Sequence, residues 1–240
     1  MIFDLDGTPP DIGFPDIGLA EEEPNGLLAV GGDLSQDRVL NAYRRGIFPW
    51  YSPGQPILWW SPAPRMVLFP AEFHCSRSLR RSLRKRAYDV SVNLAFEEVI
   101  RACAEPRGLT EGTWLLPEMI ESYVALNQSG HAHSVEVWRD GELAGGLYGI
   151  AIGQMFFGES MFSRRDDASK VALGRLAEIA STQPFQLIDC QIHTDHLAQL
   201  GAREITREAF QQALDNAVAQ ASPALGKQAP RPAANMRWAA

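Results

Sequence analysis

The sequence predicts an α+β fold built on a mixed, mostly antiparallel sheet that is flanked by helices. Apolar and polar residues alternate over residues 134–162, which predicts three successive strands. Amphipathic helical patterns precede and follow this meander. A segment dense in aromatics and prolines, residues 47–65, fits neither pattern and predicts a separate small unit ahead of the sheet. Strands in one run and helices beside them are typical of α+β layers.

The prolines at Pro62 and Pro64 mark a natural domain boundary. We therefore divide the chain into a small N-terminal domain at residues 1–64 and a larger domain at residues 65–221. The segment that follows is rich in Ala and Pro, so we expect a loose tail at residues 222–240.

Composition narrows the classes of function. The chain has 240 residues, of which 45% are apolar, and a formal net charge of −7. These values are typical of a globular protein and argue against one coated in nucleic acid, although one local basic patch is compatible with them. The three cysteines are far apart and form no C-x-x-C pair, which favours reduced thiols and a cytoplasmic location. No signal peptide and no membrane-spanning run is evident.

The first residues resemble a phosphatase motif. The run Phe3-Asp4-Leu5-Asp6-Gly7-Thr8 matches the nucleophile motif of the haloacid-dehalogenase-like phosphatases. Pro9-Pro10 follows at once, where those enzymes continue through a loop toward a helix. No later lysine and acidic pair stands in the right order, so we favour a variable leader.

The N-terminal domain is expected to contain one helix and an aromatic cluster. Ser35 can cap a helix that ends near Gly46. The aromatic cluster then includes Trp50, Trp59 and Trp60. Aromatics at this density serve equally as the core of a small domain or as a flat surface for a nucleobase, and the two uses can coexist.

One stretch is strongly basic. Its arginines recur at helical spacing, which places them on one face, and the stretch contains Arg77, Arg80, Arg81, Arg84 and Lys85. No acidic residue is interleaved, so the like charges repel unless a polyanion neutralises them. A phosphate-backbone contact is favoured over an ordinary solvated face.

Two helices are expected before the meander. The first covers residues 93–104 with Asn93 as its cap, and the second covers residues 117–127. The histidines at His131, His133, His193 and His196 lack metal-ligand spacing, so no metal is implied.

The region after the hairpin turn at Asp140-Gly141 carries the candidate chemistry. Glu159 and Met161 are two apart on the third strand and should share a face. Asp189 and Gln191 are two apart on a later short strand, which would place both on one face and Cys190 on the other. An acid beside an amide can hold and deprotonate an amine, but a buried Asp satisfied by its neighbours fits the same stretch.

The remaining elements complete the layer. A helix follows Asp166 and Asp167, either of which can cap it. After the short strand at residues 186–192 come a short helix that closes at Gly201, a strand at residues 204–205 and a helix at residues 207–219.

Many separate motifs occur in one order, and together they resemble the bacterial leucyl/phenylalanyl-tRNA–protein transferases from about residue 14 to about residue 210. The matching segments are Glu23-Pro24-Asn25-Gly26-Leu27-Leu28, Gly31-Gly32-Asp33-Leu34, Gly46-Ile47-Phe48-Pro49-Trp50, Trp59-Trp60-Ser61-Pro62, Ser76-Arg77-Ser78, Gly112-Thr113-Trp114, His131-Ala132-His133-Ser134, residues 158–164, Ala168-Ser169-Lys170 and residues 187–191.

The resemblance implies a small N-terminal domain followed by an N-acetyltransferase-like catalytic domain that uses no coenzyme A. It also implies an activity: transfer of Leu or Phe, and less well Met, from aminoacyl-tRNA to the N-terminal Arg or Lys of a protein, which marks that protein for degradation. The donor is an activated ester, so no cofactor and no metal are expected.

The resemblance also implies site residues. Asp189 and Gln191 match the pair thought to activate the acceptor amine, and Glu159 matches a supporting acid. The donor side chain would contact Leu147, Phe156, Met161, Leu173, Leu176 and Ile188. The terminal adenosine would lie near Trp50, Trp114, Tyr43 and Tyr123, and the basic stretch matches the tRNA-binding cluster.

Some positions depart from the family pattern. Leu147 and Leu176 stand where some members carry Met and Phe, which could shift donor preference, and Thr194 stands where an Asn can occur. Two other functions stay open on the residues alone: a coenzyme A-dependent N-acyltransferase, for which Arg164-Arg165-Asp166-Asp167 makes a poor pyrophosphate turn, and a non-catalytic tRNA-binding module.

Overall fold

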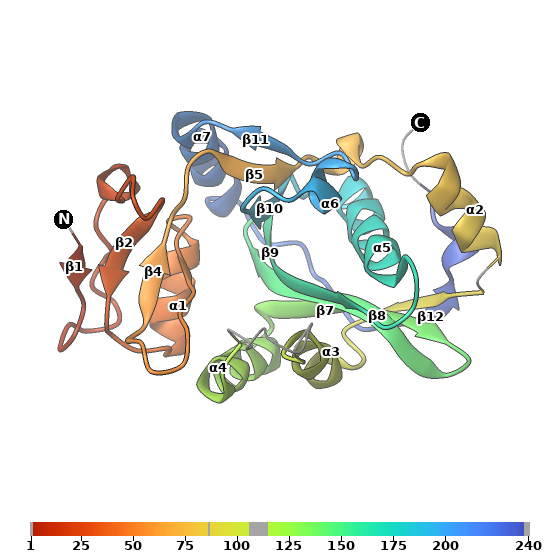
Figure 1. Cartoon of the computed structure of the whole chain (residues 1–240), viewed down its shortest axis with the longest axis horizontal. Helices are drawn as coiled ribbons and strands as arrows, with labels where there is room; N and C mark the ends of the chain where they lie inside the picture. The colour runs from red at the N-terminus through yellow and green to blue at the C-terminus, as the bar shows by residue number, and fades with distance from the viewer. Residues whose placement is uncertain (1, 86, 106–114, 238–240) are drawn as a thin grey trace.

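The computed structural model describes residues 2–85, 87–105 and 115–237, which form two sheets with helices packed against them (Figure 1). The smaller sheet has four strands in the order β1-β2-β4-β3. Its strands are β1 (Phe3–Asp4), β2 (Leu27–Val30), β3 (Phe48–Pro49) and β4 (Leu58–Trp60).

The larger sheet has eight strands in the order β11-β5-β10-β9-β8-β7-β6-β12. Only the pairing of β10 with β9 is parallel, so the sheet is mixed and mostly antiparallel, as predicted. Its strands are β5 (Arg65–Leu68), β6 (Asp89–Val92), β7 (Ala132–Arg139), β8 (Glu142–Ile152), β9 (Met155–Ser163), β10 (Leu187–Gln191), β11 (Arg203–Ile205) and β12 (Gln228–Pro232).

Helices cover both faces of the larger sheet. Figure 1 shows α3 and α4 on one face and α5 on the other. The α-helices are α1 (Gln36–Tyr43), α2 (Arg77–Lys85), α3 (Phe96–Cys103), α4 (Pro117–Gln128), α5 (Ala168–Thr182), α6 (Asp195–Ala198) and α7 (Arg207–Val218); short 3₁₀ turns cover Ile17–Leu19, Pro70–Glu72 and Ala233–Asn235. None of the helices in the described residues is long and apolar enough to cross a membrane.

The aromatic cluster of the N-terminal part is used both as core and as surface. Trp59 is fully buried, its indole N–H donates to the Gly31 carbonyl over 3.0 Å, and the ring of Phe14 packs against it edge-on. Trp50, by contrast, is 44% exposed. Ser35 caps α1 as predicted, since its side chain accepts from the Arg38 N–H.

The start of α3 differs from the prediction. Asn93 does not cap this helix; its side-chain oxygen accepts from the Ser134 N–H on β7. The buried carboxylate of Glu136 on β7 instead accepts from the N–H groups of Leu94 and Ala95, at 3.2 and 3.3 Å, and from the hydroxyl of Ser134. The turn that leads into α3 is therefore held by a strand that is distant in sequence.

We expect Glu136→Ala to lower the free energy of unfolding by about 2 kcal/mol or more, because two hydroxyls and two helix-end N–H groups would lose a buried acceptor. Urea unfolding followed by circular dichroism measures this. Glu97→Ala, an exposed position on the same helix, is the control and should change stability little. An equal loss in both variants would contradict the assignment.

The four strands of the smaller sheet, two short strands of the larger sheet and the C-terminal segment were not predicted. β5 and β6 are only four residues long, too short for a clear alternation. The tail, expected to be loose, forms β12 against β6, and Glu178 on α5 accepts from the side chain of Arg231 and the N–H of Arg237. Long-range pairing and a buried carboxylate fix this segment although its composition suggests disorder.

Candidate functional site

The main site is a cavity that opens where β9 and β10 separate. The two strands pair in parallel from Leu187 with Met155 to Asp189 with Phe157, and the pairing stops there. Beyond that point the second half of β9 and the end of β10 line a cavity of about 740 Å³, together with α5, α6 and residues 48–50. A volume of this size is typical of small-molecule sites.

Two one-residue bulges lie at this opening and change which way the side chains point. In β9, Tyr148 pairs with Ser160 and Gly149 with Gly158, so Glu159 is the extra residue. In β10, Asp189 pairs with Val67 and Gln191 with Met66, so Cys190 is extra. Bulges re-aim side chains and are frequent beside active sites.

The bulge in β9 overturns the expected shared face of Glu159 and Met161. Met161 pairs with Leu147, on the face covered by α5. Glu159 instead accepts from Tyr123 on α4, which lies on the opposite face. Both side chains still reach the cavity, because the opening passes through the plane of the sheet.

Asp189 does not face the cavity, contrary to the expected shared face with Gln191. It is fully buried, and its two oxygens accept from the guanidinium of Arg65 at 2.8 and 2.6 Å. Its Oδ1 also accepts from the N–H of Gln191 over 2.9 Å. This N–H holds Gln191 in a left-handed conformation, with φ of 65°, that turns its side chain back toward β9. Asp189 therefore positions Gln191 and has no contact with the cavity.

A chain of side-chain hydrogen bonds runs inward from the cavity. Gln191 Nε2 donates to Glu159 Oε1 over 2.8 Å. The Tyr123 hydroxyl donates to Glu159 Oε2 over 2.9 Å, and the Tyr43 hydroxyl lies 2.6 Å from that of Tyr123. Because the Tyr123 hydroxyl donates its one hydrogen to Glu159, the Tyr43 hydroxyl must be the donor in its bond with Tyr123.

The carboxyl of Glu159 has the electrostatics of a general base. Burial raises its pKa from 4.5 to about 7, and the nearby negative charge of Asp189 adds to the rise, while the two tyrosine hydroxyls and the Arg65 guanidinium act in the opposite direction. A base works best when its pKa lies near the working pH. Glu159 is only 9% exposed but lines the cavity, so a bound amine could reach it.

At the cavity the thiol of Cys190 is a poor nucleophile, and the imidazole of His196 is kept neutral. Burial raises the pKa of the Cys190 thiol far above its ordinary value, which leaves it protonated. Burial and the charge of Lys170 lower the pKa of His196. The site therefore offers a carboxyl with a pKa near neutrality beside an amide, with a neutral imidazole in the same cavity.

Five of the six residues expected to contact the donor side chain line one wall of the cavity. The cavity has an apolar wall formed by Leu147, Met161, Leu173, Leu176 and Ile188. Phe156, which was expected with them, does not line it. Its side chain is buried beneath the sheet surface and packs edge-on against Phe185.

The expected adenosine-side aromatics divide into two groups. Trp50 lines the cavity mouth and stands 5.8 Å from the ring of Trp60. Tyr43 and Tyr123 are buried, so they cannot stack on a base, and their role is the hydrogen-bond chain to Glu159. Trp114 lies outside the described residues.

The basic stretch forms α2, as predicted. Leu79 and Leu83 are buried, whereas the side chains of Arg77, Arg80, Arg81, Arg84 and Lys85 are exposed. Within residues 2–85, 87–105 and 115–237, no carboxylate forms an ion pair with them. Figure 1 shows α2 at the opposite end of the molecule from the small sheet.

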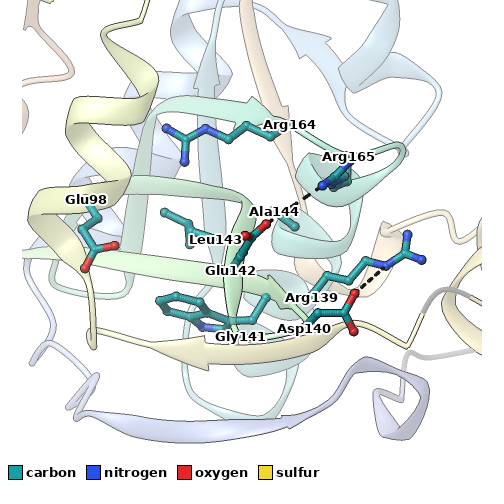
Figure 2. Close-up of a pocket in the computed structure, with 10 residues that line it drawn as sticks. Glu98, Arg139, Asp140, Gly141, Glu142, Leu143, Ala144, Arg164 and Arg165 are labelled. Atoms are coloured by element: carbon teal, nitrogen blue, oxygen red, sulfur yellow. Dashed lines mark ion pairs between the residues drawn. The ribbon is translucent and has the colours of Figure 1, made fainter.

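A second hollow, of about 770 Å³, lies between α3 and the β7–β8 hairpin (Figure 2). Its charged lining residues are Glu98, Arg139, Asp140, Glu142, Arg164 and Arg165. Carboxylates and guanidiniums are equal in number there, so the hollow favours neither anions nor cations. No group of three or more His, Cys, Asp or Glu side chains in the described part of the chain could hold a metal ion.

Arg65 is a site residue that the sequence did not predict, and Thr194 and His196, which were not among the expected site residues, line the cavity. The one available signal was an arginine heading the apolar run Met66–Leu68, directly after Pro64. A charged residue at the start of a buried strand implies a buried partner, but the sequence does not identify that partner.

Comparison with known proteins gives a family. The sequence model of the leucyl/phenylalanyl-tRNA protein transferases matches residues 67–215, and that of their N-terminal domain matches residues 32–63. Curated relatives carrying the same description match over most of their length. The chain is 57% identical to the Chromobacterium violaceum protein, over 89% of this chain and 92% of the relative. It is 54% identical to the Nitrosomonas eutropha protein, over 95% of this chain and 93% of the relative.

Two solved structures show weaker similarity. A ribosomal-protein-alanine N-acetyltransferase from Brucella melitensis aligns with a TM-score of 0.36 and 15% identity, over 45% of this chain and 82% of that one. A GCN5-related N-acetyltransferase-like protein from Streptococcus suis aligns with a TM-score of 0.34 and 12% identity, over 67% and 59%. Scores below 0.5 at these identities support no argument about this chain.

Proposed function

Because the chain belongs to the leucyl/phenylalanyl-tRNA–protein transferase family, we propose that it transfers leucine or phenylalanine from aminoacyl-tRNA to the amino terminus of a protein through the cavity between β9 and β10. The observation that carries this assignment is the cavity itself. It joins an apolar wall to the Gln191–Glu159 pair and has Trp50 at its mouth.

The apolar wall supports a leucine or phenylalanine donor. Its five residues offer no charged or hydrogen-bonding group, so a charged amino acid would lose its hydration without compensation. Size is discriminated weakly in such a pocket, at about 1–3 kcal/mol per methylene. We therefore propose that methionine is a third, poorer donor. Trp50 is the exposed ring on which the terminal adenine can stack.

In this proposal Glu159 removes the proton from the acceptor. The α-amine has an ordinary pKa of about 7.7–8.0, so it arrives largely as an ammonium ion. Glu159 takes one proton, and the free amine attacks the ester carbonyl. A C–N bond forms, the ester C–O bond breaks, and the ribose hydroxyl leaves with the proton that Glu159 returns. Glu159, again a carboxylate, then takes the second proton from the nitrogen of the new amide and releases it to solvent. Gln191 donates to Glu159, which leaves its carbonyl oxygen available to orient the amine.

The finer points of the assignment rest on the family resemblance of the motifs. We propose that the acceptor begins with Arg or Lys, that transfer marks it for degradation, and that the reaction takes place in the cytoplasm, where charged tRNA is made and used.

One assay tests the function. Purified protein is incubated with tRNA charged with labelled leucine and a peptide that begins with Arg. The expected product is the peptide extended by one leucine at its amino terminus, identified by mass spectrometry. An acetylated peptide of the same sequence is the control and should remain unmodified. Absence of extension with both leucyl- and phenylalanyl-tRNA would overturn the proposal.

The exposed basic face of α2 is proposed to contact the tRNA backbone. Arg80→Ala combined with Arg84→Ala should weaken tRNA binding and reduce the slope of log K against log salt by about 1–2, because each neutralised phosphate contributes about 0.7–0.9. Fluorescence anisotropy at several KCl concentrations measures both. Arg101→Ala with Arg203→Ala removes the same charge from exposed ion pairs elsewhere and is the matched control. Equal slopes in the two double variants would show that the arginines of α2 are exposed to solvent and do not contact the tRNA backbone.

A further inference from the structure

Arg65 is a buried cation at the junction of three parts of the molecule. Its side chain is only 1% exposed. The guanidinium lies 5.1 Å from the ring centre of Phe48 on β3 and 4.5 Å from that of Phe210 on α7. The same group donates two hydrogen bonds to Asp189 on β10. A bidentate pair between aromatic faces fixes position and orientation more strictly than a single contact.

Its partner then acts on the cavity. Asp189 Oδ1 accepts from both Arg65 Nε and the Gln191 N–H, so one oxygen joins the cation to the left-handed turn. Gln191 in turn donates to Glu159. Three consecutive contacts therefore connect Arg65 to the carboxyl that takes the proton in the proposed reaction, although Arg65 does not line the cavity.

We propose that Arg65 is a positioning residue for amine activation: through Asp189 it holds the Gln191 turn against Glu159 and couples that turn to the Phe48 segment and α7. The expected effect of Arg65 on the rate rests on the proposed transfer reaction. Its expected effect on the titration of Glu159 does not depend on that reaction. A pair that only held the fold together would leave kcat unchanged in any variant that keeps both the fold and the charge, such as Arg65→Lys.

Five groups on separate elements face Glu159: Tyr43, Tyr123, Tyr148, Asp189 and Arg65. Only Asp189 and Arg65 are ionic, and they affect the Glu159 proton in opposite directions. Removing Arg65 leaves the site one charge more negative, so Glu159 should release its proton at higher pH. Removing the charge of Asp189 leaves the site more positive, so the release should occur at lower pH.

The experiment compares Arg65→Gln, Asp189→Asn and the double variant R65Q/D189N. Proteins labelled with ¹³C at the glutamate carboxyls are titrated by NMR without substrate, and Glu159→Gln assigns the Glu159 signal. We expect the midpoint to rise by about one pH unit in Arg65→Gln, to fall by about one in Asp189→Asn and to return near the wild-type value in the double variant. Arg65→Lys should keep the midpoint because it keeps the positive charge. It should lower kcat with little change in KM, because lysine cannot form the two parallel hydrogen bonds of a guanidinium to Asp189.

Unmoved midpoints, or shifts of one sign in both single variants, would overturn the inference. If Arg65→Gln does not fold, the double variant R65Q/D189N provides the test, because it removes both charges and leaves no buried charge unpaired. A wild-type kcat in the double variant would show that the Arg65–Asp189 pair does not position Gln191. The NMR midpoints are measured without substrate. A wild-type protein that transfers no leucine would therefore refute the proposed function and leave the charge coupling separately tested.

Discussion

Glu159→Gln is expected to lower kcat for leucine transfer by about 10²–10⁴-fold, the usual contribution of a positioned general base. The variant keeps the shape of the side chain and can still accept from Tyr123, while its NH2 group can donate to the carbonyl oxygen of Gln191 if that amide turns over. Steady-state transfer from leucyl-tRNA to an Arg-terminated peptide measures it. KM for the charged tRNA should be nearly unchanged, because Glu159 is not part of the apolar wall.

The pH dependence of the wild-type enzyme follows from the same group. Below about pH 7 the Glu159 carboxyl is protonated and cannot take a proton, so kcat should fall with decreasing pH around a midpoint near 7. The residual activity of Glu159→Gln should lack that midpoint. An unchanged acid limb in the variant would assign the titration to another group and remove Glu159 from its proposed role.

Stability gives an independent control on this variant. The folded protein holds the Glu159 proton up to about pH 7, whereas the unfolded chain releases it near 4.5. The folded state therefore binds more protons between these values, and wild-type stability should decline by about 3 kcal/mol as pH rises through this window. Glu159→Gln should not show this decline. A variant that is inactive and also less stable at pH 8 would point to misfolding instead of lost catalysis.

The fold was predictable wherever a pattern was long enough to have a period. The observed bounds of the meander strands agree with the alternation of apolar and polar residues, and those of α2 and α7 agree with the helical spacing of their residues. Elements specified by distant partners were not predictable. The turn into α3 is held by Glu136 on β7, and β12 depends on β6 and on the carboxylate of Glu178. Local sequence carries no record of such contacts.

Several residues that line the cavity were expected from the sequence, but Arg65, the exclusion of Phe156 and Asp189 from the lining, and the geometry were not. A strand with strict alternation would place Asp189 with Gln191 and Glu159 with Met161, and one extra residue in each strand reverses that assignment. The bulges are invisible in the sequence because Cys190 and Glu159 are ordinary strand residues. Asp189, which was expected to hold the amine, instead accepts from the N–H of Gln191, and in our proposal the role of base belongs to Glu159.

Leu176→Phe is expected to change donor choice more than any other apolar substitution in the cavity. Leu176 lies on α5 beside an open volume, so a larger ring can extend into the cavity without overpacking the core. The space left should still admit a leucine side chain but exclude much of a phenylalanine ring. We expect kcat/KM for phenylalanyl-tRNA to fall about 10–100-fold relative to leucyl-tRNA, the range in which apolar pockets discriminate by size.

Competition between the two charged tRNAs for one limiting peptide measures that ratio directly. Phe156→Leu is the matched control: it alters a buried apolar residue of the same sheet that does not line the cavity, so it should lower stability and leave the donor ratio unchanged. If Leu176→Phe leaves the ratio unchanged, or both variants shift it equally, the donor side chain does not occupy this wall. The ester would then have to bind elsewhere in the cavity, and the alignment of its carbonyl with Gln191 and Glu159 would lose its basis.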